Sequence, residues 1–436
     1  MQLKGERVSI THSCGEITPA LEGKEVVLAG FVKNVRDLGG IRFFLLYDIW
    51  GEVQVTAPKS LTTPEVFALL PSLTPESAVL VKGTVKAAEQ APGGVEVLPK
   101  TVEVLSRASV PLPLDPTGRI KSTLETRLNA RVLDLRHAQR RNIFKARHIV
   151  LDSIRGFFSS RGFLEVHTPK IVATATESGS ALFPVAYFER EAFLSQSPQL
   201  YKEVLTGCFQ KVFEIGPIFR AEEFNTPKHL NEAISVDIEV AFADCEDVMK
   251  LLEELIDNIV GSLKEKMGKQ LPSLDQLTPR PPFERLTYAE ALEALEKRGY
   301  KIPWGSDLPT PAERILGEGR EFYFITHWPA ECKPFYAMPC QDNPSCTETF
   351  DLMWKDLELA SGGTRIHQPK LLEEKLRSKG LNPESFEPHL RHFRWGLVPP
   401  HAGWGLGLER LLMVLTGQEN IRECVLFPRD RHRLVP

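Results

Sequence analysis

The sequence has no apolar run long enough to cross a membrane. Its 436 residues contain no stretch of about 20 apolar side chains, and the first residues, Met1 to Arg7, lack the apolar core of a signal peptide. We therefore expect a cytoplasmic protein with no membrane partner. The remaining composition, 42% apolar and 25% charged, is ordinary for a globular protein of two or three domains.

Cysteine is scarce and scattered. The sequence has seven cysteines, an odd number, and no two of them form a Cys-x-x-Cys pair. A disulfide framework or a structural zinc site calls for paired, closely spaced cysteines. The sequence predicts neither.

Positive charge is not in excess. Lysine and arginine number 53 against 57 aspartates and glutamates, which gives a formal net charge of -4. That balance argues against a protein that coats nucleic acid through nonspecific phosphate contacts. If RNA binds, it requires local basic patches and a few base contacts.

Residues 26 to 104 read as short strands separated by turn signals. The strands are expected at Val26–Val35, Ile41–Asp48, Gly51–Ala57, Val79–Val85 and Val95–Val104, with a short helix, Pro64–Leu70, between the third and the fourth. This is the element order of a five-stranded OB-fold barrel, which commonly binds oligonucleotides. A small barrel without a ligand is the alternative.

A hinge separates this barrel from the rest of the chain. Val110–Pro116 holds three prolines and favours extended backbone. We therefore place an N-terminal domain at 1–106, a linker at 107–135 and a larger domain at 136–436, with a helical excursion at about 244–320.

The larger domain mixes helices and strands, so we assign the protein to the α+β class. Apolar residues at steps of three and four predict a long helix at Arg140–Arg161 with one buried face. Further helices are expected at Asp244–Met267 and Tyr288–Arg298, and strands at Val212–Phe219, Ile234–Phe242, Glu321–Thr326 and Thr349–Leu359. Gln270–Pro282, with four prolines, is expected at the surface.

Two segments carry arginines that could hold a polyphosphate from two sides. Phe219-Arg220-Ala221-Glu222-Glu223 ends one strand and begins a polar loop to the next, so a hairpin presents a guanidinium. Gly403-Trp-Gly-Leu-Gly-Leu-Glu-Arg410 is a glycine-rich strand. Gly405 and Gly407 leave one of its faces bare, so that a flat ring could lie against the backbone.

The order and the amino-acid sequences of these segments resemble those of the class II aminoacyl-tRNA synthetases, most closely the aspartyl-tRNA synthetases of the archaeal type. Arg140–Arg161 followed by Phe163-Leu-Glu-Val-His-Thr-Pro169 is similar to motif 1 of that class, Phe219–Glu222 to motif 2, and Gly403–Arg410 to motif 3. Three motifs in order are a strong signal, whereas a single glycine-rich string would be a weak one.

The resemblance implies a fold and an assembly. The N-terminal OB-fold would bind an anticodon, and the catalytic domain would have a mostly antiparallel sheet flanked by helices. The chain would form a homodimer through the motif 1 helix and strand. From periodicity alone, an ordinary core helix is an equally good interpretation of Arg140–Arg161.

The implied enzyme is a ligase that activates L-aspartate with ATP and transfers it to the 3′ end of tRNA(Asp), leaving open whether tRNA(Asn) is charged too. By resemblance, Arg220 and Arg410 are its catalytic residues, holding the α- and γ-phosphates. The nucleotide would also meet Glu222, His229 and Gly407. The alternatives are surface ion pairs for the arginines and a solvated loop position for the histidine.

Metal binding is implied by Glu358 and Ser361, three positions apart. Oxygen ligands that leave room for phosphate and water suit Mg²⁺, and the resemblance implies that Glu358 contacts ATP through it. A buried, paired carboxylate is the alternative for Glu358.

The side chain of aspartate is a second carboxylate, and an enzyme that binds it needs cations held in fixed positions. By resemblance Arg365 clamps that carboxylate, Lys202 adds a point charge, and Ser361 lies beside them. The α-ammonium group would meet the acceptors Glu177, Gln199 and Asp237, of which Glu177 lies in a segment similar to the loop that closes over the amino acid. His401 would lie near the amino acid, or be a structural histidine.

For tRNA, Phe43 and Gln54 are similar to the pair that stacks on and hydrogen-bonds the central anticodon base. Arg36 would add a phosphate or base contact. Phe43 and Phe44 are neighbours in a strand, so only one of them can face the barrel core. Pro92 resembles the residue at this position in enzymes that also charge tRNA(Asn). Lys33 matches neither those enzymes nor the ones that are strict for tRNA(Asp).

Three other functions stay open. One is an asparaginyl-tRNA synthetase, against which Lys202 and Arg365 argue. Another is a paralogue that makes asparagine from aspartate and ATP, although the paralogues of that kind lack the barrel. The third is a catalytically silent RNA-binding paralogue, which would have no reason to keep Arg220, Glu222, Glu358 and Arg410 together.

Overall fold

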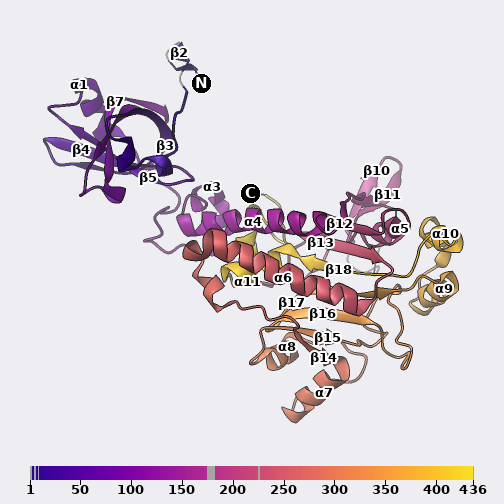
Figure 1. Cartoon of the computed structure of the whole chain (residues 1–436). Coiled ribbons are helices and arrows are strands. Elements are labelled where there is room, and N and C mark those ends of the chain that lie inside the picture. Colours follow the sequence, from indigo (N-terminus) through magenta and orange to yellow (C-terminus); the bar gives the residue numbers. More distant parts are fainter. Residues whose placement is uncertain (1, 4–5, 8, 174–181, 224–225, 436) are drawn as a thin grey trace. The chain divides into compact units, whose positions relative to one another are not determined.

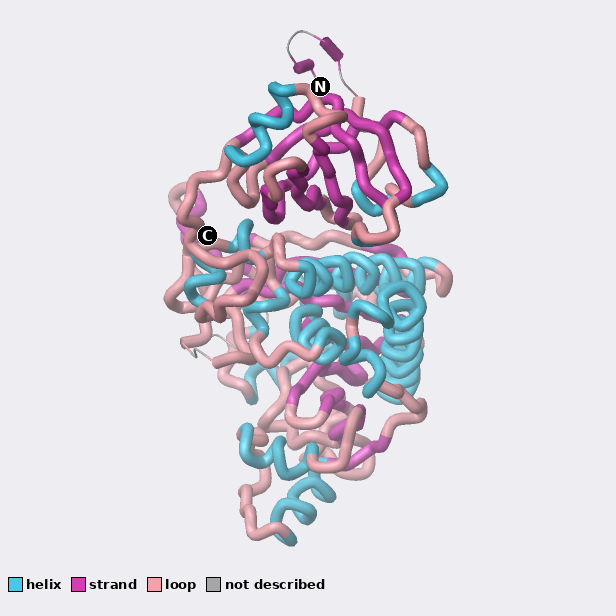
Figure 2. The backbone as a smooth tube through the Cα atoms, turned by 90° about the vertical axis from the view of Figure 1, so that its left-hand side faces the viewer, coloured by secondary structure: helices cyan, strands magenta, loops and turns pink. Residues whose placement is uncertain are grey.

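The computed structural model describes residues 2–3, 6–7, 9–173, 182–223 and 226–435. The chain forms two compact units, 1–113 and 114–436 (Figures 1 and 2). The predicted linker is divided between them, and its second part forms two short helices, α2 (Leu124–Asn129) and α3 (Arg131–Asp134). Among the described residues, no helix is both long and apolar enough to cross a membrane.

The N-terminal unit is a closed five-stranded barrel, as the sequence predicts. The strands follow one another around it in the order β3-β4-β5-β7-β6. Valine and leucine side chains at alternate strand positions fill its interior. The elements are β1 (Gln2–Leu3), β2 (Glu6–Arg7), β3 (Glu25–Asp37), β4 (Ile41–Tyr47), β5 (Glu52–Pro58), α1 (Pro64–Leu69), β6 (Ala78–Ala87) and β7 (Val95–Ser106).

The second unit is built on an eight-stranded sheet in the order β14-β15-β16-β17-β18-β13-β12-β8. In the described part of this sheet only the β12/β8 and β14/β15 pairs are parallel, so the predicted α+β class with a mostly antiparallel sheet is confirmed. Its strands are β8 (Leu164–Glu165), β12 (Lys211–Phe219), β13 (Glu232–Ala241), β14 (Glu284–Thr287), β15 (Phe322–Thr326), β16 (Thr349–Trp354), β17 (Leu357–Arg365) and β18 (His401–Gly407). A smaller sheet joins β9 (Ile171–Val172), β10 (Pro184–Tyr187) and β11 (Arg190–Leu194).

Long helices cover one face of the large sheet. The helices α4 (Ala138–Ser159) and α6 (Cys245–Met267) lie side by side (Figure 1), and α11 (Leu408–Thr416) packs into the same core. The helix α6 begins at a capping box, in which the Asp244 and Asp247 side chains each accept a hydrogen bond from the other's backbone N–H. The remaining helices are α5 (Gln199–Phe209), α7 (Tyr288–Lys297), α8 (Thr310–Gly317), α9 (Pro369–Ser378) and α10 (Glu387–Arg394).

The predicted apolar face of α4 is a core face of its own unit. Ile143, Val150, Ile154, Phe157 and Phe158 are all buried against α6 and the sheet. The ordinary core helix therefore explains the periodicity. Any contact with a second chain would have to use other residues of this helix.

Three details of the sequence prediction were wrong. Thr349–Leu359 is not one strand, because the chain turns at Lys355 and forms β16 and β17. The excursion at 244–320 is not wholly helical, since β14 lies within it and extends the sheet. Gln270–Pro282 is not a simple surface loop, because Leu271, Leu274 and Leu277 are buried.

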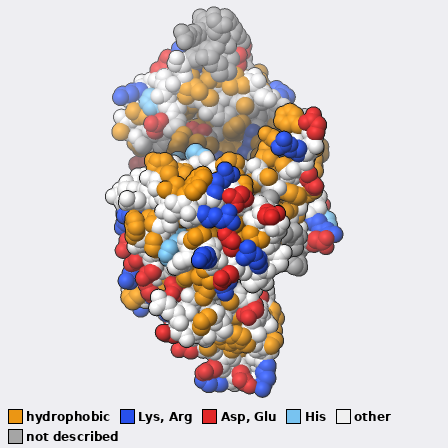
Figure 3. Space-filling view, turned by 90° about the vertical axis from the view of Figure 1, so that its right-hand side faces the viewer, with side chains coloured by type: hydrophobic (Ala, Val, Ile, Leu, Met, Phe, Trp, Pro, Cys, Tyr) orange, Lys and Arg blue, Asp and Glu red, His pale blue; other side chains and the backbone are white. Residues whose placement is uncertain are grey.

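The surface in Figure 3 agrees with the balanced composition. On that face of the molecule, blue basic and red acidic side chains lie interspersed among hydrophobic ones. A field of one sign, which a nonspecific nucleic-acid coat requires, is not seen on it.

Candidate active site

A cavity of about 320 Å³ lies on the sheet face opposite the long helices. The strand β18 explains why there is space. Ala402, Trp404 and Leu406 point into the helix-covered core, where Trp404 Nε1 donates a hydrogen bond to the Val248 carbonyl at 3.1 Å. The alternate positions Gly405 and Gly407 line the cavity.

Glycine is required in this strand by close contacts. A Cβ atom on Gly403 would lie 2.4 Å from the Glu239 carboxylate, and one on Gly405 would lie 3.1 Å from Asp237 Oδ1. The bare face predicted from the sequence therefore lets two carboxylates of β13 lie directly against β18.

Cations outnumber anions in the cavity lining. Among the described residues, the lining holds six basic side chains, Lys202, Arg220, Lys228, Lys333, Arg365 and Arg410, and four acidic ones, Glu222, Asp237, Glu358 and Glu409. All the predicted ATP-binding residues line this cavity, and so do Gln199, Lys202, Asp237, Ser361 and Arg365. An excess of cations in a partly open cavity suits an anionic ligand.

Arg220 and Arg410 enter the cavity from different elements. Arg220 follows β12 and lies 3.8 Å from Glu222, while Arg410 is in the first turn of α11. Arg410 Nη1 donates to the Glu358 carbonyl at 3.0 Å and lies 3.5 Å from its carboxylate. Burial and the charge of Arg410 lower the pKa of His229, so this histidine is neutral at pH 7. This end of the cavity therefore presents two fixed guanidinium groups.

Glu358 and Ser361 lie on β17 beside a cation that the sequence did not reveal. Lys333 donates to both Asp351 oxygens, at 2.7 and 2.8 Å, and Asp351 is the β16 partner of Ser361. Burial opposes ionisation of Glu358, but the charges of Arg410, Lys333 and Arg220 outweigh it and lower the pKa of its carboxyl. An ionised carboxylate and a hydroxyl facing the cavity are ligands suited to Mg²⁺.

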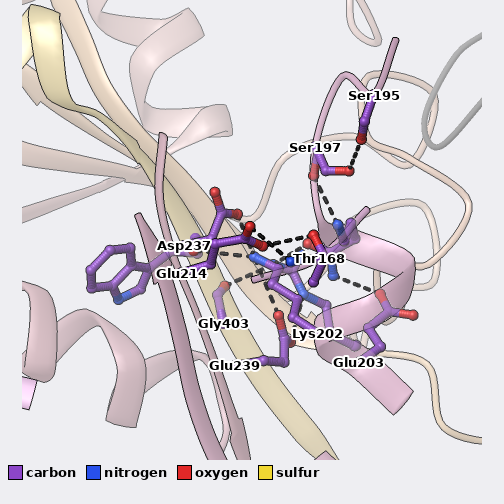
Figure 4. Close-up of polar contacts among 12 residues, drawn as sticks. Thr168, Ser195, Ser197, Lys202, Glu203, Glu214, Asp237, Glu239 and Gly403 are labelled. Carbon is purple, nitrogen blue, oxygen red and sulfur yellow. Dashed lines mark hydrogen bonds and ion pairs between the residues drawn. The ribbon is translucent and has the colours of Figure 1, made fainter. Parts of the chain in front are cut away.

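The other end of the cavity is a buried network of charges (Figure 4). Lys202 Nζ donates to Asp237 Oδ1 at 2.8 Å and lies 3.4 Å from Glu239 Oε2. Arg365 Nε donates to Glu239 Oε1 at 3.1 Å, and Arg365 Nη2 donates to the Gly403 carbonyl at 2.9 Å. Glu239 is fully buried and does not line the cavity, so it holds both cations from behind.

One predicted ligand of the amino acid, His401, is not among the described residues that line the cavity. His401 is fully buried, contacts the Pro399 carbonyl through Nδ1 at 2.7 Å and is not part of the lining, in agreement with the structural alternative. Glu177 lies outside the described residues.

Family models match both units of the chain. One for class II tRNA synthetases (D, K and N) covers residues 123–431, and one for the OB-fold nucleic acid binding domain covers residues 26–105. The first match spans more than half of the chain and the whole cavity. The chain belongs to the class II tRNA synthetases. It is an aminoacyl-tRNA synthetase, and hence a ligase.

Individual relatives resemble this synthetase over nearly its full length. The aspartate–tRNA(Asp/Asn) ligase of Methanopyrus kandleri is 55% identical over 97% of this chain and 98% of its own. The aspartate–tRNA(Asp) ligase of Pyrococcus abyssi is 52% identical over 98% of this chain and 99% of its own. Among solved structures, asparaginyl-tRNA synthetase from Pyrococcus horikoshii complexed with asparaginyl-adenylate is 33% identical with a TM-score of 0.93, covering 99% of this chain and 100% of that one.

The barrel of the synthetase presents the predicted anticodon residues on its surface. Phe44 is fully buried, so Phe43 points outward and is half-buried. Arg36 pairs with Phe43 across β3 and β4, and its guanidinium lies 5.9 Å from the Phe43 ring. Gln54 lies on the neighbouring strand β5, where its Nε2 donates to Thr56 Oγ1 at 3.0 Å. Pro92 is exposed in the short turn between β6 and β7.

Several residues of the synthetase site were missed from the sequence. Glu239 could have been found, because it lies two positions after Asp237 and so shares its strand face. Lys333 has no comparable signal, since it lies in the irregular segment between β15 and β16. Glu203 was also missed; it lies one helical turn after Gln199 and is next to His389.

Proposed function

We propose that this synthetase activates L-aspartate with ATP and transfers it to the 3′ end of tRNA(Asp) and tRNA(Asn). The observation that carries the proposal is the pair of cations, Lys202 and Arg365, that Glu239 holds at one end of the cavity. A planar guanidinium and a neighbouring ammonium suit a carboxylate side chain. The relatives' names support the same amino acid, and the ligase of Methanopyrus kandleri is named for both tRNA(Asp) and tRNA(Asn).

The first step joins the aspartate α-carboxylate to the α-phosphorus of ATP and releases pyrophosphate. Negative charge grows on the phosphate oxygens in the transition state, and fixed cations stabilise it without a protein nucleophile. Arg220 would hold the α-phosphate, and Arg410 the γ-phosphate. Glu222 accepts from the adenine amino group, His229 lies beside the nucleotide, and Gly407 gives the ring access to the backbone.

The α-ammonium group of aspartate needs acceptors at the same end of the cavity. The Gln199 amide oxygen and the Asp237 carboxylate are available in the lining, and Ser361 lies between this end and the phosphate end. Glu177 would complete this set when the amino acid is bound.

Mg²⁺ is the metal that Glu358 and Ser361 fit. Bound there with ATP, it supplies positive charge against the phosphates. We expect Glu358→Gln to raise, by roughly tenfold or more, the Mg²⁺ concentration that gives half the maximal rate of pyrophosphate exchange into ATP. An amide is a weaker ligand of Mg²⁺ than a carboxylate. A Mg²⁺ titration of pyrophosphate exchange measures this, with the exposed Glu374→Gln as the matched control. An unchanged Mg²⁺ requirement would argue against Glu358 as a ligand.

An asparaginyl-tRNA synthetase is the nearest competing function, because asparaginyl enzymes share this fold. Asparagine would turn the NH₂ group of its amide toward the donors of Lys202 and Arg365, and an unmatched polar contact of this kind costs roughly 3 kcal/mol. Aspartate-dependent exchange of pyrophosphate into ATP tests the proposal, with asparagine as the comparison. Exchange with neither amino acid would favour the silent RNA-binding paralogue.

Charging of purified tRNA(Asp) and tRNA(Asn) with aspartate, in separate reactions, tests the proposed tRNA range. We expect both to be charged. Charging of tRNA(Asp) alone would identify a strict enzyme, and charging of neither would remove the proposal.

Phe43 is proposed to stack on the central anticodon base. Phe43→Ala should raise the KM for tRNA by about tenfold, since stacking on an aromatic ring contributes about 1–3 kcal/mol per base. Adenylate formation should not change, because the catalytic cavity is formed by residues of the other unit. Aminoacylation and pyrophosphate exchange measure the two effects. An unchanged KM for tRNA would contradict the stacking role.

We also propose a homodimer that uses α4 and β8. The buried face of α4 is occupied by its own unit, but Leu164 of β8 is 46% exposed and available to a partner. Light scattering of the purified protein tests the assembly.

A further inference from the structure

Glu203 and His389 form a buried contact directly behind the amino-acid end of the cavity. Glu203 is fully buried on α5, and His389 of α10 is 7% exposed. His389 Nε2 lies 3.2 Å from Glu203 Oε2, and neither residue lines the cavity. A buried carboxylate is stable only beside a partner that balances its charge. Packing alone therefore does not explain why a carboxylate and a histidine lie together at this buried position.

Glu203 also fixes the orientation of a residue that does line the cavity. Gln199 Nε2 donates to Glu203 Oε1 at 2.6 Å (the Glu203 contact is drawn in Figure 4). An ionised carboxylate only accepts hydrogen bonds, so Gln199 has to turn its NH₂ group toward Glu203. Its amide oxygen then points the other way and accepts a hydrogen bond from Arg365 Nη2 at 3.5 Å. Without such a partner, the two ends of an amide can exchange places.

The surroundings keep Glu203 ionised. Burial opposes its charge, but His389 and the nearby His401 outweigh burial and lower the pKa of the carboxyl. Glu203 is consequently an acceptor at neutral pH.

We propose that Glu203, held by His389, is a positioning residue that turns the Gln199 amide oxygen into the cavity to receive the α-ammonium group of the amino acid. The proposal rests on the proposed function and adds a residue pair to it. Glutamine at position 203 can donate as well as accept, so it would let the Gln199 amide turn over and present NH₂ to an ammonium group.

The test is pyrophosphate exchange by the full-length Glu203→Gln variant, which keeps the side-chain shape. We expect the KM for aspartate to rise about tenfold, the effect of one lost charge-assisted hydrogen bond, with kcat and the KM for ATP within about twofold. Succinate has both carboxylates of aspartate and lacks the ammonium group. Its inhibition constant should change far less than the KM for aspartate.

Two further variants separate positioning from a general effect on the fold. Glu253→Gln makes the same change at a buried carboxylate of α6, which contacts the Phe283 N–H and Arg285 away from the cavity, and should leave the KM for aspartate unchanged. His389→Phe, beside Phe393, should raise that KM in the same direction. The double variant with Glu203→Gln should be no worse than Glu203→Gln alone, because the two residues act as one unit.

The outcomes distinguish this proposal from the function on which it rests. Absence of aspartate-dependent exchange in the wild type would remove the proposed function and this proposal together. Exchange in the wild type, with an unchanged KM in Glu203→Gln or with equal weakening of aspartate and succinate, would overturn the positioning role alone. Additive effects of the two substitutions would contradict the link to His389.

Discussion

Replacing Arg365 by lysine is expected to lower kcat/KM for aspartate by about three orders of magnitude, while the KM for ATP stays within about twofold. Arg365 is 5% exposed and uses Nε for Glu239 and Nη2 for the Gly403 carbonyl. A lysine ammonium is a single point that cannot make both contacts and also face a ligand carboxylate. The fully buried Glu239 would then lose the hydrogen bond that Arg365 Nε donates to it.

Pyrophosphate exchange at varied aspartate and varied ATP separates the two effects. Arg298→Lys is a suitable control, because Arg298 pairs with Glu318 at 2.6 Å on the surface, where both side chains are more than half exposed. Similar losses for aspartate and ATP in Arg365→Lys would show that this residue does not read the amino-acid side chain.

The residues that the sequence located well are those in continuous motifs. Arg220 and Glu222 lie two positions apart directly after β12, and Gly405, Gly407 and Arg410 lie within six residues where β18 leads into α11, so the spacing in sequence restricts their relative positions. The barrel was also predicted closely, because each strand has alternating burial and a turn signal at its end.

The residues that were missed depend on contacts between distant segments. His389 meets Glu203 from another helix, and Lys333 reaches Asp351 from an irregular segment. Local pattern carries no information on which segments of the chain come together. Glu239 was missed for another reason, although its spacing to Asp237 was a usable signal. A carboxylate in a strand of a half-buried sheet is most often exposed to solvent.

The turn between β16 and β17 shows how tertiary contacts override a local pattern. Lys355 has φ 51°, an uncommon conformation for a residue with a side chain, and no glycine or proline marks the turn. Its carbonyl accepts from the Tyr323 hydroxyl at 3.0 Å, and Lys228 donates to the Asp356 carbonyl at 2.6 Å. These distant partners stabilise a turn that the sequence did not predict.

The second large effect is expected on stability. Lys202→Met removes the cation that lies between Asp237 and Glu239, all three being buried. Breaking a buried ion pair in this way costs about 3–5 kcal/mol, which corresponds to a fall of roughly 5–10 °C in the Tm of the catalytic unit. Aspartate activation should be lost as well, because only Arg365 remains to balance the ligand carboxylate.

Thermal unfolding at neutral pH tests this account of Lys202. Lys301→Met removes a lysine that is 80% exposed beside Glu296, and it should not shift the Tm measurably. A Tm of Lys202→Met equal to that of the wild type would mean that Asp237 and Glu239 are not held by this cation. The two charges of the amino-acid site would then have to be balanced through Arg365 alone.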